Sequence, residues 1–164
     1  MSMVIVDKII EILEHPFGKG NLEPDGIQWS AYAISGTDTY ETVESITIDQ
    51  IGVAGGPGGE GILIEVELGV TWGQKCDGVT DKAVGKVQAR NKGGTWVDLM
   101  TEVTNDAAGT TEEVKTYSGR FKTVADFSKV PFDVRVQVKS NGTTNNAVGR
   151  TKNSSYVKCL YKIA

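Results

Sequence analysis

The chain has 164 residues, which is the size of one domain and enough to bury a hydrophobic core without disulfides or a metal. It carries 20 glycines but only 4 prolines, and 39% of its residues are hydrophobic, a composition typical of short strands joined by many turns. Its 17 lysines and arginines are outnumbered by 21 acidic residues and lie scattered among them, so nucleic acid is not expected as a partner. No apolar run reaches the length of a transmembrane helix, and a membrane partner is not expected either.

The N-terminal stretch Val4–Glu14 has apolar residues at three- and four-residue spacings with charged residues between them. This spacing predicts a short amphipathic helix or arm, which Pro16 ends because a proline disfavours helical geometry in the residue before it. The element either covers one open end of the domain or docks on a neighbouring subunit. We expect residues 1–26 to form this arm and a connector, and residues 27–164 to form a β-sandwich domain. The arm residues expected to bind a partner are Ile5, Ile9, Ile12 and Leu13.

Two strands are predicted next, Ile27–Ser35 and Val43–Val53. The apolar phase of the second strand changes near Asp49-Gln50, which indicates a β-bulge. The glycine-rich segment Gly55–Gly61 follows, and it lacks the lysine and the helix of a phosphate-binding loop. We therefore interpret it as a flexible hairpin loop.

The clearest strand pattern is Ile62–Trp72, where apolar residues alternate with polar ones without a break. Period two with one apolar face is typical of a half-buried strand. Phe132–Val138 alternates in the same way and predicts a second half-buried strand. In the loop after Trp72, Asp77 and Asp81 lack the dense oxygen pattern of a calcium loop, so a solvated turn is expected.

The segment Gly85–Leu99 predicts a β-hairpin. Two short strand-like runs, Lys86–Arg90 and Thr95–Leu99, flank Gly93-Gly94, and a glycine pair supplies the positive φ that a tight turn needs. Trp96 lies in the second run, while Val97 and Leu99 occupy the opposite phase.

The remaining chain predicts two short strands, Glu112–Ser118 and Gly119–Phe127, then a long exposed loop, Ser140–Asn153, and a last strand, Ser155–Ile163. Together these patterns give about eight or nine strands and few helices. The predicted fold is all-β: a two-sheet antiparallel β-sandwich, jelly-roll-like, with a short N-terminal arm or helix.

Catalytic chemistry has little support in the sequence. The only histidine is His15, so no nucleophile and base pair and no zinc site of the usual kind can be assembled, and no cofactor is expected. Glu65 and Glu67 share a strand face and would suit a hydrolase, but strand alternation explains them better. Cys76 and Cys159 are interpreted as separate thiols, with a disulfide left open.

Exposed tryptophan side chains would indicate a second kind of function, the binding of sugars. Trp29 and Trp72 are in phase with core positions, whereas Trp96 is a possible ligand-binding residue that would stack on a sugar ring. The alternative function is therefore a carbohydrate-binding β-sandwich module of the tail-fibre or lectin type. Its glycan site would combine Trp96 with the loops Gly36–Thr42 and Ser140–Asn153.

The hairpin also carries a resemblance to a known family. Val87-Gln88-Ala89 before Gly93-Gly94-Thr95-Trp96-Val97-Asp98-Leu99 resembles a strand pair of β-sandwich proteins in tailed-phage particles, and Pro131-Phe132-Asp133-Val134-Arg135-Val136 is similar to the strand that follows there. Decoration or cement proteins, head fibres and tail or baseplate sandwiches share this pattern. The resemblance covers about the C-terminal half and transfers no binding residue.

The resemblance implies a non-enzymatic virion structural protein that decorates or cements a phage-like particle. Its partners would be other virion proteins and further copies of itself in a homo-oligomer. The N-terminus lacks the basic leader and cleavage site of a secretory signal, so we expect synthesis in the host cytoplasm followed by assembly into the virion.

Overall fold

The structure is a computed structural model, and it describes residues 10–17, 21–22, 28–29, 33–34, 38–48, 61–91, 93–122, 132–152 and 154–163. In these ranges the chain forms thirteen strands, and it contains no helix long and apolar enough to span a membrane. The strands are β1 (Ile10–Phe17), β2 (Asn21–Leu22), β3 (Gln28–Trp29), β4 (Ala33–Ile34), β5 (Glu41–Ile48), β6 (Gly61–Cys76), β7 (Ala83–Asn91), β8 (Val97–Asp98), β9 (Val103–Thr104), β10 (Glu113–Lys122), β11 (Phe132–Ser140), β12 (Ala147–Thr151) and β13 (Ser155–Ile163).

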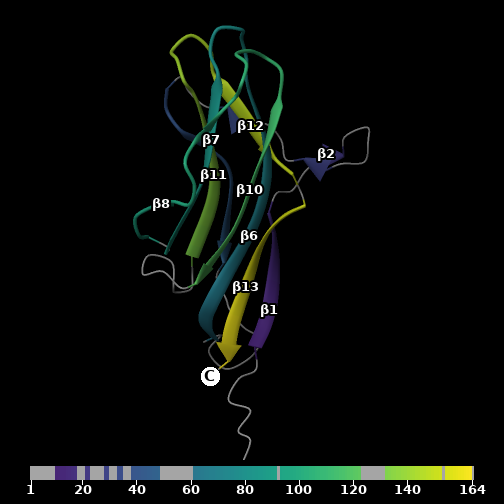
Figure 1. Cartoon of the computed structure of the whole chain (residues 1–164), viewed down its shortest axis with the longest axis vertical. Coiled ribbons are helices and arrows are strands. Elements are labelled where there is room, and N and C mark those ends of the chain that lie inside the picture. Colours follow the sequence, from purple (N-terminus) through teal and green to yellow (C-terminus); the bar gives the residue numbers. More distant parts are fainter. Residues whose placement is uncertain are drawn as a thin grey trace, which may run out of the picture.

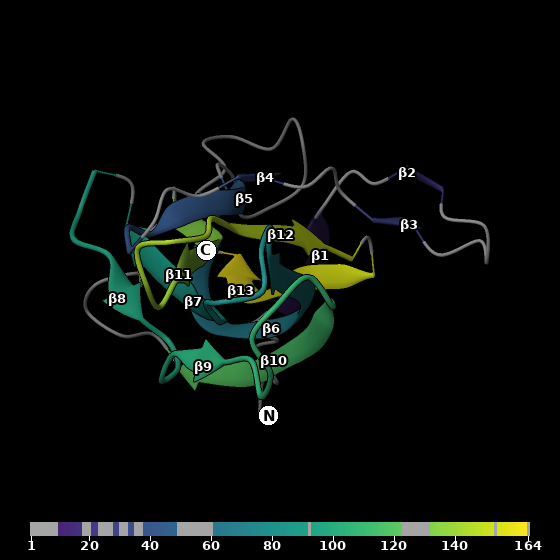
Figure 2. The ribbon, with the colours of Figure 1, turned by 90° about the horizontal axis from the view of Figure 1, so that it is seen from above.

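Two antiparallel sheets face each other across the core (Figure 2). The larger sheet has the order β1, β13, β6, β12, β4, and β10 pairs with the opposite edge of β6. The smaller sheet has the order β5, β11, β7, β8, with β9 also paired to β7. Strands β2 and β3 form a separate pair.

The strand order is that of a jelly roll. Along the main pairings, the larger sheet runs β1, β13, β6, β10 and the smaller one runs β5, β11, β7, β8, so the first strand lies beside the last. The chain passes between the sheets at β4 to β5, β5 to β6, β6 to β7, β9 to β10, β10 to β11 and β11 to β12. These alternating crossings define a jelly-roll sandwich, which confirms the predicted all-β, two-sheet architecture.

Strand β6 forms the centre of the larger sheet, as Figure 1 shows. The predicted alternation is confirmed for Leu68, Val70 and Trp72, which are at most 1% exposed. The side chains of Ile62, Ile64 and Val66 lie outside the described set. Apolar side chains of the smaller sheet pack against this face, namely Val87, Ala89, Val134, Val136 and Val138.

A polar group lies within this core. Gln74 follows Trp72 on the inward face of β6 and is fully buried. Its Oε1 accepts a hydrogen bond from Trp72 Nε1 at 2.8 Å, and its Nε2 donates to Asn105 Oδ1 at 2.8 Å. The same Nε2 lies 3.1 Å from the carbonyl oxygens of Ala83 and Val103. These bonds satisfy the buried amide and join β6 to β7 and β9.

The helix predicted for Val4–Glu14 is wrong over Ile10–Glu14, which belong to strand β1. β1 pairs with β13 along its whole length, from Ile10 opposite Lys162 to Phe17 opposite Ser155. The isoleucines suit an extended strand, and Pro16 is tolerated because β1 lies at the edge of the sheet. Residues 1–9 of the predicted arm lie outside the described residues, and the boundary proposed at residue 26 stays a prediction.

Two other predictions in the C-terminal half need correction. The pair of strands predicted over Glu112–Ser118 and Gly119–Phe127 is one continuous strand, β10, because Gly119 keeps the register with Leu68. The loop predicted over Ser140–Asn153 contains strand β12, whose inward residues are small or polar and therefore lack an apolar alternation. Phe127 and the predicted bulge at Asp49-Gln50 lie outside the described residues.

The predicted hairpin over Gly85–Leu99 is confirmed. β7 and β8 pair antiparallel with Ala89 opposite Val97, and Gly93 in the turn has a φ of 78°. The predicted last strand has the bounds of β13. The range predicted as one strand, Ile27–Ser35, contains β3, which pairs with β2, and β4, which pairs with β12 in the larger sheet, so the single predicted strand is wrong.

Candidate binding surfaces

Trp96 lies on the outer face of the smaller sheet. Its hairpin neighbour Val97 is paired with the inward residue Ala89, so Trp96 takes the opposite phase and is half-buried. The guanidinium carbon of Arg135 lies 3.8 Å from the centroid of the indole, and that of Arg90 lies 4.3 Å from it. Trp96 therefore packs beneath two arginines and outside the core.

Hydrogen bonds fix the side chains around this tryptophan. Arg90 Nε donates to Asp133 Oδ2 at 2.9 Å, and Thr47 Oγ1 donates to the other oxygen of that carboxylate at 2.7 Å. Gln88 Nε2 donates to Asp98 Oδ1 at 2.6 Å, and Lys86 Nζ lies 3.1 Å from the same oxygen. This face therefore carries an ordered polar network.

Tyr40 is a second aromatic side chain on this face. Lys86 Nζ lies 4.3 Å and Lys139 Nζ 5.0 Å from its ring centroid, and its hydroxyl donates to Glu102 Oε2 at 2.5 Å. Partial burial raises the pKa of Tyr40, and the hydrogen bond to Glu102 raises it further. The hydroxyl consequently stays protonated and continues to donate.

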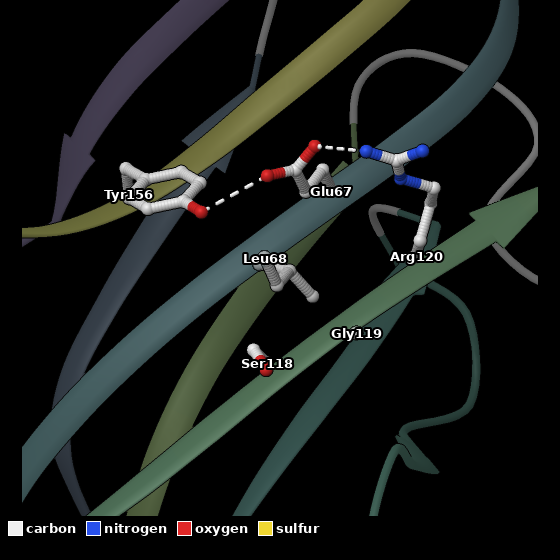
Figure 3. A pocket seen from close by; sticks show the side chains of 6 residues that line it. All are labelled: Glu67, Leu68, Ser118, Gly119, Arg120 and Tyr156. Carbon is white, nitrogen blue, oxygen red and sulfur yellow. Dashed lines mark hydrogen bonds and ion pairs between the residues drawn. The ribbon is translucent and has the colours of Figure 1, made fainter.

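The outer face of the larger sheet holds a shallow hollow of about 240 Å³ between β6, β10 and β13 (Figure 3). Glu67 connects its two sides: its carboxylate accepts from the Tyr156 hydroxyl at 3.0 Å and from Arg120 Nη2 at 3.0 Å. The Tyr156 ring lies over Gly69, where a Cβ would clash with it. The hydrogen bond from Tyr156, followed by that from Arg120, lowers the pKa of Glu67.

Replacing Tyr156 with phenylalanine should raise the pKa of Glu67 toward its ordinary value, because the variant removes the largest cause of the shift. The pKa of Glu67 is lower in the folded chain, so its contribution to stability is present above the unfolded pKa. That contribution is lost as the pH falls through the folded pKa. A carboxyl NMR titration of Glu67 measures the change. Tyr40→Phe is the matched control and should leave Glu67 unchanged, whereas an unchanged Glu67 titration in Tyr156→Phe would contradict the assignment.

Three loops gather at one end of the molecule, those between β6 and β7, β9 and β10, and β11 and β12 (Figure 1). Asp81 is 7% exposed, and its Oδ2 accepts from the backbone N–H groups of Thr144 at 2.9 Å and Asn145 at 2.7 Å. Asp77 Oδ1 likewise accepts from Asn146 N at 2.8 Å. The predicted solvated turn is therefore wrong for Asp81, which holds two loops together. Across the described part of the chain, no group of three or more His, Cys, Asp or Glu side chains is placed to hold a metal.

The predicted arm residues are only partly placed. Ile12 and Leu13 lie in β1, opposite Leu160 and Cys159 of β13, while Ile5 and Ile9 fall outside the described residues. The two described residues, Ile12 and Leu13, belong to the larger sheet, whereas Trp96 lies on the smaller sheet. Cys76 is a free, buried thiol, and burial raises its pKa.

The fold and its surfaces together define a jelly-roll β-sandwich with two polar outer faces.

No protein-family model matches the sequence, and no curated protein sequence matches it. The chain is similar to chains in the structures of two strains of infectious bursal disease virus. For the Gt strain the identity is 10% and the TM-score 0.49, covering 92% of this chain and 33% of that one. For the Gx strain they are 8% and 0.48, covering 94% and 37%.

A third similar structure is the T13 particle of infectious bursal disease virus, with 8% identity and a TM-score of 0.47, covering 93% of this chain and 35% of that one. The chain therefore spans about a third of the length of the solved chains that it resembles.

Proposed function

We propose that this chain is a non-enzymatic structural protein of a virus particle, which it decorates or cements through protein–protein contacts. The observation that carries the proposal is the complete jelly-roll strand order, an architecture that recurs in viral capsid domains as well as in lectins and cupins. The resemblance of Gly85–Leu99 to tailed-phage sandwich proteins supports the same class. The chain would be made in the host cytoplasm and function in the virion, as a homo-oligomer or bound to other virion proteins.

A non-enzymatic role agrees with the engagement of the carboxylates on both outer faces. Glu67 binds Tyr156 and Arg120, Asp98 binds Gln88 and Lys86, and Asp133 is held by Arg90 and Thr47. Each of these three carboxylates has a partner that fixes its position in the fold, which a structural role explains without a substrate.

The N-terminal arm is proposed as one contact with the particle. Ile5→Asp combined with Ile9→Asp in the full chain should abolish association with the particle, because the variant places two charges in an apolar contact. Co-sedimentation of the chain with its particle measures this.

Val79→Asp is the matched control, since Val79 is 79% exposed at the loop end of the sandwich and lies far along the chain from the arm. Normal co-sedimentation of the Ile5 and Ile9 variant would refute the proposed role of the arm. Equal loss in both variants would show that any added charge disturbs binding, and would likewise remove the arm as the cause.

A carbohydrate-binding module remains the second candidate, because Trp96 lies at the surface of the sandwich. It has less support, since a sugar stacks on an aromatic face and Arg135 lies 3.8 Å from the centroid of this ring. The loop after Ser140, which was expected to form part of the glycan site, is instead hydrogen-bonded to Asp77 and Asp81. A glycan array in which the chain binds and Trp96→Ala does not would favour this candidate, and an array without hits would oppose it.

A further inference from the structure

Within the described part of the chain, the guanidinium group of Arg135 forms no ion pair with an acidic side chain. Its Nε donates to Gln88 Oε1 at 2.8 Å, and the plane of the group lies close to the Trp96 ring. Among the residues that the structure describes, its Nη1 and Nη2 atoms meet no acceptor. A half-buried arginine therefore presents four unused N–H groups at the outer face of the smaller sheet.

The surrounding charges leave this arginine uncompensated. Asp133 is held by Arg90, and Asp98 is held by Lys86 and Gln88. Desolvation lowers the pKa of Arg135, and the neighbouring charge of Arg90 lowers it further, while Asp98 opposes them. An arginine stays protonated in proteins, so a positive charge persists here, and the neighbouring acid Asp98 is already bound by Lys86 and Gln88.

The unused edge has the geometry of a carboxylate receptor. Nη1 and Nη2 form a planar fork that binds the two oxygens of a carboxylate side by side. Gln88 and Trp96 hold the guanidinium in place, so little side-chain freedom remains to be lost on binding. The site is already ordered before any ligand arrives.

The surroundings favour a carboxylate that belongs to a protein. A single exposed ion pair contributes little, so a free anion gains little on an open face. Nucleic acid is disfavoured because the chain has a net charge of −4 and its basic residues are scattered among acidic ones, whereas nucleic acid binding needs a concentrated positive field. A protein surface brings further contacts of its own and needs only one acidic side chain at this point.

We propose that Arg135, stacked on Trp96 and flanked by Arg90, is the docking point for an aspartate or glutamate side chain of a protein partner. This inference rests on the proposed role in assembly, and it names the chemistry of one contact. The arginine and tryptophan would form the centre of that contact, since these residue types carry much of the binding energy at interfaces.

The test uses the full chain and a hexaglutamate peptide as the probe. NMR follows the Arg135 Nε–Hε and Trp96 Nε1–H signals during titration. We expect saturable shifts with hexaglutamate and none with hexaglutamine. Arg135→Gln should weaken binding about tenfold or more, because it removes the charge-assisted bonds. Arg135→Lys keeps the charge but loses the planar fork and should bind less tightly than the native chain.

Arg120→Gln is the matched control, because Arg120 is an exposed arginine on the other sheet and should not affect the titration. Equal binding by Arg135→Gln and the native chain, or no shift up to about 10 mM peptide, would overturn the proposal. The last titration uses inorganic phosphate. NMR shifts as large as those with hexaglutamate would assign the site to a free oxyanion instead. The titration needs no virus particle. Carboxylate binding at Arg135 can therefore be confirmed even if the chain is not a virion protein, and it can be refuted even if the chain is one.

Discussion

Replacing Val70 with aspartate should abolish folding of the sandwich. Val70 is fully buried on the inward face of β6, at the centre of the larger sheet. Removing one partnerless carboxylate from water costs several kcal/mol in a protein interior, against a total stability of about 5–15 kcal/mol for a domain of this size. Circular dichroism and gel filtration of the purified variant would reveal the loss of the native fold.

Thr116→Asp is the control for this variant. Thr116 is exposed on the outer face of β10, paired with Thr71, so the same charge faces water there. This variant should fold with near-native stability. A folded Val70→Asp chain with an unchanged melting temperature would contradict the placement of β6 in the core.

Replacing Gln74 with leucine should destabilise the fold by about 4 kcal/mol, because each buried polar group left without a partner costs about 1–3 kcal/mol. The variant removes the acceptor for Trp72 Nε1 and the donor for Asn105 Oδ1, and it leaves two backbone oxygens without their bonds to the amide. The added apolar contact of leucine offsets only part of this cost. Urea unfolding of the native chain and the variant, fitted with one common dependence of the unfolding free energy on urea concentration, measures the difference in stability.

Gln137→Leu provides the matched comparison. Gln137 is 6% exposed and makes one long hydrogen bond of 3.4 Å, to Thr42 Oγ1. Its replacement should cost less than about 1 kcal/mol. Equal losses of stability in the two variants would show that the Gln74 network contributes no more than an ordinary side chain.

The strands with strict alternation could be predicted from the sequence. Leu68, Val70 and Trp72 face inward as period two requires, and the turn at Gly93-Gly94 fixes the hairpin. Strand β12 could not be found in this way, because its inward residues Ala147 and Gly149 are small and are buried by strands distant in the sequence; Gly149 lies against Val43 and Val138 of the smaller sheet. The strand β1 was missed for a related reason: the same isoleucines fit a helical spacing, and the pairing with β13 decides between the two.

The candidate site was less accessible to prediction than the fold. The opposite phase of Val97 indicated that Trp96 leaves the core, and the alternation of β11 places Arg135 on an outward face. Their contact follows from the pairing of β11 with β7, which sets Arg135 opposite Gln88. A single sequence contains no local signal for such long-range pairing. The buried bond between Gln74 and Asn105, 31 residues apart, was hidden for the same reason.

The native mass of the complex that contains this chain tests the proposed virion role most directly. Analytical ultracentrifugation of the material from the cells that produce it, with detection of the chain, gives this mass. The proposal predicts that most of the chain sediments in a particle-sized assembly, far above the 17.6 kDa of one copy. Sedimentation of the chain only as a free monomer, with particles present in the same sample, would contradict it.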